Sequence, residues 1–180
     1  MTVFTIGHSR RAVEELARLL GEQGVDLVVD VRSFPRSRAN PQFNSDALSA
    51  ALDAFGIGYR HLRALGGRRG PQRLDGPSPN GMWRNAGFRN YADYALTPEF
   101  RAGLDALREL ARAHTCAIMC AEAVWWRCHR QIIADTLLAA GFDVAHIVGP
   151  GRLEAARLTP GAQVQADGAL HYPGEQGVLI

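Results

Sequence analysis

Apolar runs of strand length alternate along the chain with segments whose apolar residues recur at helical spacing. The run at residues 3–6 is followed by a helical pattern in "RRAVEELARLLGEQG", which places Leu16, Leu19 and Leu20 on one face. Next, "VDLVVDVRSFP" is apolar without alternation until Pro35, as expected for a strand buried on both faces of a parallel sheet. The pattern then predicts a helix in "NSDALSAALDAFG" and a strand in "IGYRHL".

The second half of the chain begins with a gap in this alternation. Residues 65–90 have neither a helical nor a strand period, which predicts a long loop of the functional or disordered kind. After it, "TPEFRAGLDALRELARAH" predicts a helix, "TCAIMCAE" a strand, "HRQIIADTLLAAG" a helix and "FDVAHIVG" a strand. The last thirty residues predict only a short helical piece and a polar, Gly-rich tail.

This order of elements predicts an α/β fold, a single three-layer domain with a mostly parallel sheet of about five strands, Rossmann-like or rhodanese-like. Residues 1–150 form the predicted domain, and residues 151–180 are an extension that belongs to the same domain or is a flexible tail. Ligands of such sheets bind beyond the carboxyl ends of the strands. That edge is where we expect the functional side chains.

Composition narrows the class of protein. The content of 47% hydrophobic residues with a net charge of +2 is typical of a soluble globular domain, and no apolar window is long enough to span a membrane. Three cysteines crowd into residues 116–128, which favours reduced thiols, and the N-terminus lacks the apolar core of a signal peptide, so we expect a cytoplasmic protein. Residues 60–90 carry seven arginines against Asp75, which predicts an anionic partner.

The stretch "CAEAVWWRCHR" at residues 120–130 concentrates reactive side chains and allows three interpretations. In the first, Cys120 is a nucleophile at a strand end, facing the N-terminal amides of the next helix. In the second, Cys120, Glu122, Cys128 and His129 bind zinc or iron, although the adjacent Cys128 and His129 are not expected to reach one ion together. In the third, the cysteines fill the core and Arg130 pairs with Glu122.

Other strand ends contribute further candidates to the same edge. His8 or His129 offers a general acid or base, and Asp30 or Glu122 an orienting carboxylate. Arg32, Arg38 and Arg130 offer an anion clamp. The alternative for Asp30 and Arg32 is an internal ion pair that shapes the loop, and the alternative for His8 is a ring hydrogen-bonded within its own turn.

Two resemblances add to this picture. The order "VVDVR", then "IMCAEAVWWR" and "ADTLLAAGFDVAHIVG" resembles the rhodanese-like fold, in which a strand ends in a cysteine, although the spacing from Cys120 to Arg127 is longer here. More specifically, "TIGHS", "DVRSFPRSR" with "PQFN", "YRHLRALGG", "CAE" and "CHR" together resemble the domain of unknown function 488 family, from Thr5 to about His146. The second resemblance implies a fold and a set of candidate residues rather than a reaction.

The residues that match this family pattern form several groups along the chain. They are Gly7, His8 and Ser9; Asp30, Arg32, Pro35 and Ser37; Phe43 and Asn44; Tyr59, Leu65, Gly66 and Gly67; and Cys120, Glu122, Cys128, His129 and Arg130.

We therefore expect a cytoplasmic enzyme that acts on a phosphate-bearing or nucleotide-like substrate. The expected catalytic residues are Cys120, Glu122, Cys128, His129, His8 and Asp30, and the expected substrate-binding residues are Ser9, Arg32, Ser37, Arg38, Asn44, Tyr59, Gly66, Gly67 and Arg130. One alternative is sulfurtransferase or phosphatase-type chemistry at a Cys120 thiolate. Another is a nucleic-acid-binding module that uses the Arg-rich segment 60–90. No cofactor is firmly implied, although zinc or iron fits the cysteine-rich stretch.

Overall fold

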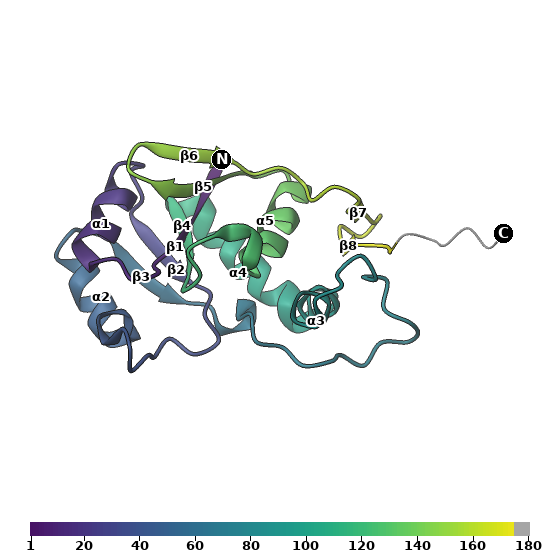
Figure 1. Ribbon diagram of the computed structural model, residues 1–180. Coiled ribbons are helices and arrows are strands. Elements are labelled where there is room, and N and C mark those ends of the chain that lie inside the picture. The colour runs from purple at the N-terminus through teal and green to yellow at the C-terminus, as the bar shows by residue number, and fades with distance from the viewer. Residues whose placement is uncertain (175–180) are drawn as a thin grey trace.

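The central element of the computed structural model, which describes residues 1–174, is a six-stranded sheet in the order β3-β2-β4-β1-β5-β6 (Figure 1). Its strands are β1 Thr2–Gly7, β2 Leu27–Asp30, β3 Gly58–His61, β4 Cys116–Cys120, β5 Asp143–Gly149 and β6 Arg152–Ala155. The first five are parallel to one another, and β6 runs antiparallel to β5. The predicted α/β class with a mostly parallel sheet is confirmed, with six strands where about five were expected.

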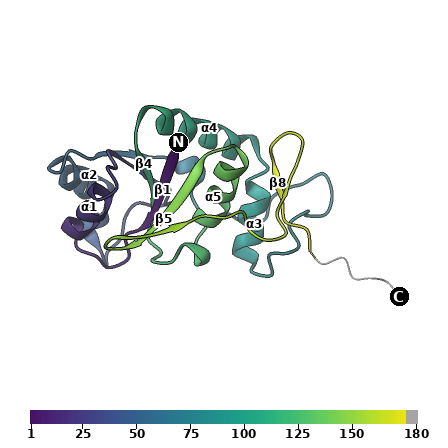
Figure 2. The same ribbon diagram turned by 90° about the horizontal axis from the view of Figure 1, so that it is seen from above.

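Helices cover both faces of this sheet (Figures 1 and 2). They are α1 Val13–Gly21, α2 Ser45–Asp53, α3 Ala86–Tyr94, α4 Pro98–Ala113 and α5 Arg130–Ala139, with short 3-10 turns at η1 Pro41–Phe43, η2 Arg63–Leu65 and η3 Trp125–Arg127. Within residues 1–174, no helix is long and apolar enough to cross a membrane.

The alternation of side chains along each strand divides the core into two parts. On β4, Ala117 and Met119 pack with α1 and α2, whereas Cys116, Ile118 and Cys120 pack with α3, α4 and α5. Successive side chains of a strand point to opposite faces, so a central strand with helices on both sides is apolar throughout. This is the three-layer arrangement of a Rossmann-like domain, and it turns the last residue of β4 toward α5.

The segment predicted as a loop at residues 65–90 contains the start of α3, so that part of the prediction is wrong. The side-chain oxygen of Asn85 caps the helix by accepting hydrogen bonds from the amides of Gly87 (2.8 Å) and Phe88 (3.2 Å). The first turn is exposed, whereas the four consecutive residues 91–94 are buried. A helix buried around its whole circumference at one end has no amphipathic period, which explains why the pattern missed it.

The helical piece predicted in the last thirty residues is also wrong. Gly151, at φ 59°, turns the chain after β5, and residues 152–155 return as the edge strand β6. Farther on, β7 Gln163–Val164 and β8 Leu170–His171 form a second, two-stranded sheet. Tyr172 is fully buried and donates a hydrogen bond of 2.9 Å to Asp135 on α5. Residues 175–180 of the predicted extension lie outside the described residues.

The connections of the sheet determine where a ligand can bind. The chain leaves β1 through α1 to reach β2, and it leaves the neighbouring β4 through α5 to reach β5, on the opposite face. In such sheets ligands bind near the switch point, beyond the carboxyl ends of the strands. The amides of His8 and Ser9 donate to the carbonyls of Cys120 (2.9 Å) and Ala121 (3.0 Å), which joins the ends of β1 and β4.

Candidate functional site

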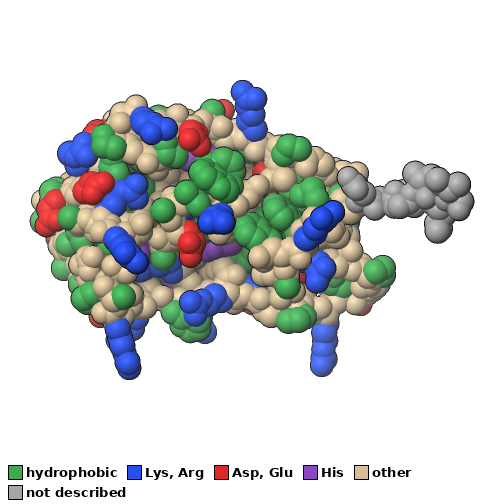
Figure 3. All heavy atoms as spheres, viewed as in Figure 1, with side chains coloured by type: hydrophobic (Ala, Val, Ile, Leu, Met, Phe, Trp, Pro, Cys, Tyr) green, Lys and Arg blue, Asp and Glu red, His purple; other side chains and the backbone are tan. Residues whose placement is uncertain are grey.

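A cavity of about 430 Å³ lies beyond the carboxyl ends of β2 and β4. Its walls come from segments that are far apart in the sequence: 32–36, 67–68, 85–91 and 120–129. In the space-filling view of the face in Figure 1, histidine surface shows in a recess near the centre, with basic, acidic and hydrophobic side chains around it (Figure 3). The predicted edge of the sheet is therefore hollowed, and the cysteine-rich stretch forms one wall of the hollow.

The sulfur of Cys128 receives more polar contacts than that of either other cysteine. Nε of Arg130 donates to this sulfur at 3.3 Å, and Nδ1 of His129 lies 3.6 Å from it. Burial by itself raises the pKa of Cys128. Hydrogen bonds from Cys120 and His129, together with the positive charge on His129 and Arg130, outweigh burial and hold that pKa well below its ordinary value. The thiol most readily ionised is thus Cys128, two positions before α5 begins at Arg130.

Arg130 provides an uncompensated positive charge inside the protein. Its side chain is 1% exposed, and among residues 1–174 no carboxylate lies within ion-pair distance of it. Nη2 donates instead to the backbone carbonyl of Glu122 at 2.5 Å, so the predicted pairing with the Glu122 carboxylate does not form. A buried charge without a counterion is costly, so the contact from Arg130 favours the thiolate form of Cys128.

The orientation of the His129 ring is determined by the hydrogen bond that its Nε2 atom makes. Nε2 lies 2.8 Å from the carbonyl oxygen of Val31, which can only accept, so Nε2 carries a proton and Nδ1 faces the two sulfurs. The ring needs the space beside Gly67, because a Cβ atom there would lie 2.3 Å from Nδ1. Tyr91 contacts the ring edge-on, with centroids 5.0 Å apart. Three separate segments thus hold this imidazole against the cysteines.

Cys120 is the partner thiol rather than the ionised one. Its sulfur lies 4.0 Å from Nδ1 of His129, and the three atoms Sγ of Cys120, Sγ of Cys128 and Nδ1 of His129 lie within 4.8 Å of one another. The hydrogen bond to Cys128, together with burial, raises the pKa of Cys120 well above its ordinary value. Cys116, at the opposite end of β4, is buried away from this cluster, and burial raises its pKa to about 12.

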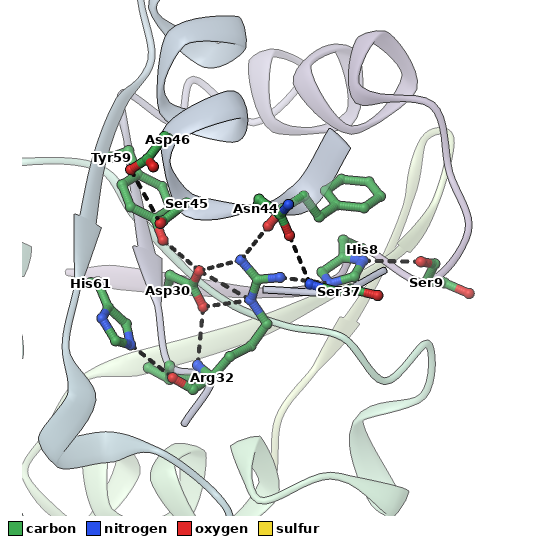
Figure 4. Close-up of polar contacts among 12 residues, drawn as sticks. His8, Ser9, Asp30, Arg32, Ser37, Asn44, Ser45, Asp46, Tyr59 and His61 are labelled. Atoms are coloured by element: carbon green, nitrogen blue, oxygen red, sulfur yellow. Dashed lines mark hydrogen bonds and ion pairs between the residues drawn. The ribbon is translucent and has the colours of Figure 1, made fainter. Parts of the chain in front are cut away.

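Asp30 and Arg32 form a buried ion pair behind the cavity (Figure 4). Nε of Arg32 donates to both carboxylate oxygens of Asp30 (2.9 and 3.0 Å), and Nη2 donates to Oδ2 (2.5 Å) and to the carbonyl of Phe43 (2.8 Å). The hydroxyl of Tyr59 donates to the same carboxylate at 2.6 Å. Because its donors are engaged in these contacts, Arg32 orders the loop after β2, which corresponds to the ion-pair alternative stated for it.

His8 completes this network on the side of β1. Nε2 accepts from Nη1 of Arg32 at 3.3 Å, Nδ1 donates to the carbonyl of Ser9 at 3.0 Å, and the ring stacks on Phe43 with centroids 4.0 Å apart. Burial lowers the pKa of His8 to about 4, with the charge of Arg32 acting in the same direction. The imidazole is therefore neutral at physiological pH and holds Arg32 in place.

The remaining predicted residues divide between the cavity wall and its support. Arg32, Gly67, Cys120, Glu122, Cys128 and His129 line the cavity. Asn44 accepts from the amide of Ser37 at 2.7 Å and thus closes the loop after β2, while a Cβ atom on Gly66 would lie 2.9 Å from Cα of Ser33. Arg38 is exposed, and neither it nor Ser9, at φ 50°, lines the cavity.

Several cavity residues were not among the sequence candidates. Phe34, Arg36, Arg68, Phe88, Tyr91 and Arg127 all contribute to the walls. Phe88 and Tyr91 lie on the helix that was predicted as a loop, so no face could be assigned to them. Arg36 and Arg68 were visible only as scattered charge, and Arg127 only through its spacing from Cys120. Phe34, with 65% of its surface exposed, lies in a segment without a period.

Part of the Arg-rich segment 60–90 is engaged within the protein. Arg69 donates to the carbonyls of Gly66 and Arg63, both at 2.9 Å, and its guanidinium lies 3.8 Å from the ring centre of Tyr94. Trp83 stacks on Phe88, with centroids 5.0 Å apart. These side chains pack in the domain rather than extend into solvent, and nucleic-acid binding by this segment stays a prediction.

The cysteine cluster also has the donor set of a partial zinc site. A tetrahedral zinc ion with Zn–S distances of about 2.3 Å and Zn–N distances of about 2.0–2.1 Å separates its sulfur and nitrogen ligands by about 3.6 Å. In this structure, Nδ1 of His129 lies 3.6 Å from the sulfur of Cys128 and 4.0 Å from that of Cys120. The adjacent residues Cys128 and His129 therefore do point toward a common position, contrary to the expectation from the sequence. Glu122 does not belong to this group, which reduces the predicted ligand set from four residues to three.

Comparison with known proteins identifies the family. A family model described as "Domain of unknown function DUF488" matches residues 12–137. Searches of curated proteins and of solved structures found no match.

Proposed function

We propose that this chain, which belongs to the domain of unknown function DUF488 family, is an enzyme whose nucleophile is the thiolate of Cys128 and whose substrate carries an anionic group. The observation that carries the proposal is the 3.3 Å hydrogen bond from Arg130, a buried guanidinium without a carboxylate partner in residues 1–174, to the sulfur of Cys128. A thiolate is the reactive form of cysteine, and a fixed positive charge beside it favours that form. The nucleophile is therefore placed at Cys128 rather than at Cys120.

His129 is the acid–base partner of this nucleophile. Its Nδ1 atom lies 3.6 Å from the sulfur of Cys128, within reach of the proton that the thiol loses, while Nε2 stays bonded to Val31. The pair is then a thiolate beside an imidazolium, held in a single orientation by backbone contacts. The same imidazolium returns its proton to the leaving group.

The walls of the cavity support a phosphate-bearing or nucleotide-like substrate. The side chains of Arg36, Arg68 and Arg127 bring positive charge to these walls. A guanidinium group binds a phosphate or carboxylate group through two parallel hydrogen bonds. Phe34 and Phe88 add aromatic surface that can cover a planar group. A volume of about 430 Å³ accommodates a small molecule.

The test is to find which cysteine reacts first. Reduced protein is treated with iodoacetamide from about pH 6 to pH 9, and the modified residue is identified by mass spectrometry in wild type, Cys128→Ser and Cys120→Ser, with Cys116→Ser as the matched control. We expect Cys128 to react well below the ordinary thiol pKa of about 8.5, and Cys128→Ser to lose this reaction. Labelling of Cys120 first, or no reaction below that pKa, contradicts the proposal.

A second candidate is a metal centre, favoured by the three ligand atoms within 4.8 Å and by the bond from Nε2 of His129 to a carbonyl, which is the usual support of a metal-binding imidazole. Cys120, Cys128 and His129 would then hold the zinc ion, which would supply Lewis-acid activation of a bound water or substrate. Metal analysis of the purified protein decides between the candidates. One equivalent of zinc that is lost in both Cys120→Ser and Cys128→Ser supports the centre. Metal-free protein whose alkylation is not slowed by added zinc excludes it.

A further inference from the structure

Cys120 lies beside the proposed nucleophile and has no role in the mechanism so far. We propose that Cys120 is a second catalytic thiol, which forms a disulfide with Cys128 and makes the enzyme a two-electron reductant of small anionic disulfides. This inference rests on the proposed function, because it requires Cys128 to attack first. It extends that function by naming the electrophilic atom of the substrate, which is a sulfur.

A reaction that uses Cys128 alone gives Cys120 no role, although the sulfur of Cys120 lies within 4.8 Å of that of Cys128. A neighbouring thiol is what a disulfide intermediate requires, because a mixed disulfide is resolved only by attack of a second thiol. Two sulfurs within 4.8 Å of each other therefore fit the requirement for a resolving thiol.

The geometry permits the disulfide bond. The two sulfurs lie within 4.8 Å, and a disulfide holds them about 2.05 Å apart, so they need to approach by no more than about 2.8 Å. Cys120 is held at the end of β4, where its carbonyl accepts from the amide of His8 at 2.9 Å. Cys128 lies between η3 and α5, outside the sheet. Movement of Cys128 toward the strand closes the bond without disturbing the sheet.

The reaction balances over two displacements. In the first, the Cys128 thiolate attacks one sulfur of the substrate R–S–S–R′, the substrate S–S bond breaks, and R′–S⁻ leaves with the electron pair. The His129 imidazolium gives its proton to this thiolate, which leaves Nδ1 free to act as a base. In the second displacement, Nδ1 of His129 removes the proton of Cys120, the Cys120 thiolate attacks the sulfur of Cys128, and R–S⁻ leaves and takes up that proton. The products are the Cys120–Cys128 disulfide and two substrate thiols. Two electrons pass from the cysteine pair to the substrate.

The environment of Cys120 changes between these two steps in the required direction. Before the first displacement, the buried sulfur of Cys120 lies within 4.8 Å of the negatively charged sulfur of Cys128, and this charge disfavours a second thiolate beside it. Once Cys128 is covalently bound, it no longer carries the negative charge that holds the proton on Cys120. His129 Nδ1, 4.0 Å from the sulfur of Cys120, is the nearest base, and Arg130 stabilises the new thiolate. The second thiol is thus activated only after the first has reacted.

The experiment uses oxidised glutathione, an anionic disulfide, as the probe on the reduced full chain, with intact-mass and peptide mass spectrometry. We expect wild type to lose two hydrogens and keep no adduct, and Cys120→Ser to keep a glutathione adduct on Cys128 that persists at least about tenfold longer. Cys116→Ser is the matched control and should behave as wild type. The neutral bis(2-hydroxyethyl) disulfide should react more slowly than glutathione disulfide.

The outcomes separate this inference from the proposed function. If Cys128 is alkylated rapidly but forms neither an adduct nor a disulfide, the inference is wrong and the proposed function stands. A stable adduct on Cys128 in wild type, or an adduct on Cys120 in Cys128→Ser, also overturns it, because Cys120 then does not resolve. If Cys128 reacts neither with glutathione disulfide nor with iodoacetamide, both fail. If the neutral disulfide reacts as fast as glutathione disulfide, the proposal that the substrate is anionic is wrong.

Discussion

Arg130 donates a hydrogen bond of 3.3 Å to the sulfur of Cys128, two positions before it, and this contact takes the place of an ion pair for a guanidinium that is 1% exposed. Through this contact, the position of the α5 helix influences the ionisation of the Cys128 thiol. The first turn of α5 buries the guanidinium beside Cys128, and the buried charge in turn favours the thiolate on the cavity wall.

Replacement of Arg130 by methionine should slow the alkylation of Cys128 without unfolding the protein. An opposite charge at this distance shifts a pKa by about one unit or more, so alkylation of Cys128 near neutral pH should fall by about tenfold or more. Because Arg130 has no carboxylate partner within residues 1–174 and the Cys128 thiol can take up a proton, the substitution leaves no buried carboxylate unpaired, and thermal unfolding checks that the variant stays folded. Arg36→Met, on the exposed side of the cavity, is the control and should leave the alkylation rate nearly unchanged. An unaltered rate in Arg130→Met would show that the thiolate does not depend on this charge.

Gly67→Ala tests the position of His129. The added Cβ atom would lie 2.3 Å from Nδ1, so the imidazole must move or the loop must shift, at a cost of about 1–3 kcal/mol. Urea denaturation should show this loss, and alkylation of Cys128 should slow because its proton acceptor is displaced. Gly70→Ala is the matched control, since a Cβ atom there meets nothing within 4 Å. Equal stabilities of the two variants would contradict the packing of His129 against Gly67.

Asp30→Asn should be strongly destabilising. It leaves the buried guanidinium of Arg32 without its counterion, which typically costs about 3–5 kcal/mol, and weakens the contact from Tyr59. Asp46→Asn removes a carboxylate from an exposed pair with Arg36 at 3.9 Å and should cost less than about 0.5 kcal/mol. Urea denaturation of both variants measures the difference. A small loss in Asp30→Asn would mean that the ion pair does not support the loop after β2.

Stability should fall as the pH is lowered from about 6.5 toward 4, because burial lowers the pKa of both His8 and His146 from 6.5 to about 4. In this window the unfolded chain binds a proton at each residue and the folded protein does not, so the free energy of unfolding decreases with falling pH. Each of the two histidines contributes at most about 3 kcal/mol to the free energy of unfolding.

Urea denaturation between about pH 7 and pH 4.5 measures this dependence. His146→Gln should remove about half of the slope, whereas His114→Gln, at a side chain 44% exposed, should leave it unchanged. A pH-independent stability of wild type across this window would contradict the burial of neutral imidazoles.

The layout of the sheet followed from local patterns. The buried strands β2 and β4 are continuous apolar runs. The α4 helix begins at Pro98, and the side chain of Thr97, directly before it, caps the helix by accepting from the amide of Phe100. Such features lie within a few residues of one another, so the sequence displays them. The sequence pattern did not predict the α3 helix, because the burial of its last turn comes from contacts with distant segments.

For the site, the sequence by itself determined which residues are chemically capable and that they meet at one edge, since the carboxyl ends of parallel strands lie together. The tertiary structure decided which of these groups pair with one another. Asp30 and Arg32 neutralise each other behind the cavity, whereas Arg130 has no carboxylate partner within residues 1–174 and donates to Cys128. Charge pairing and proton position depend on distances of 3–4 Å between groups that the chain brings together only on folding, and spacing along the sequence does not encode those distances.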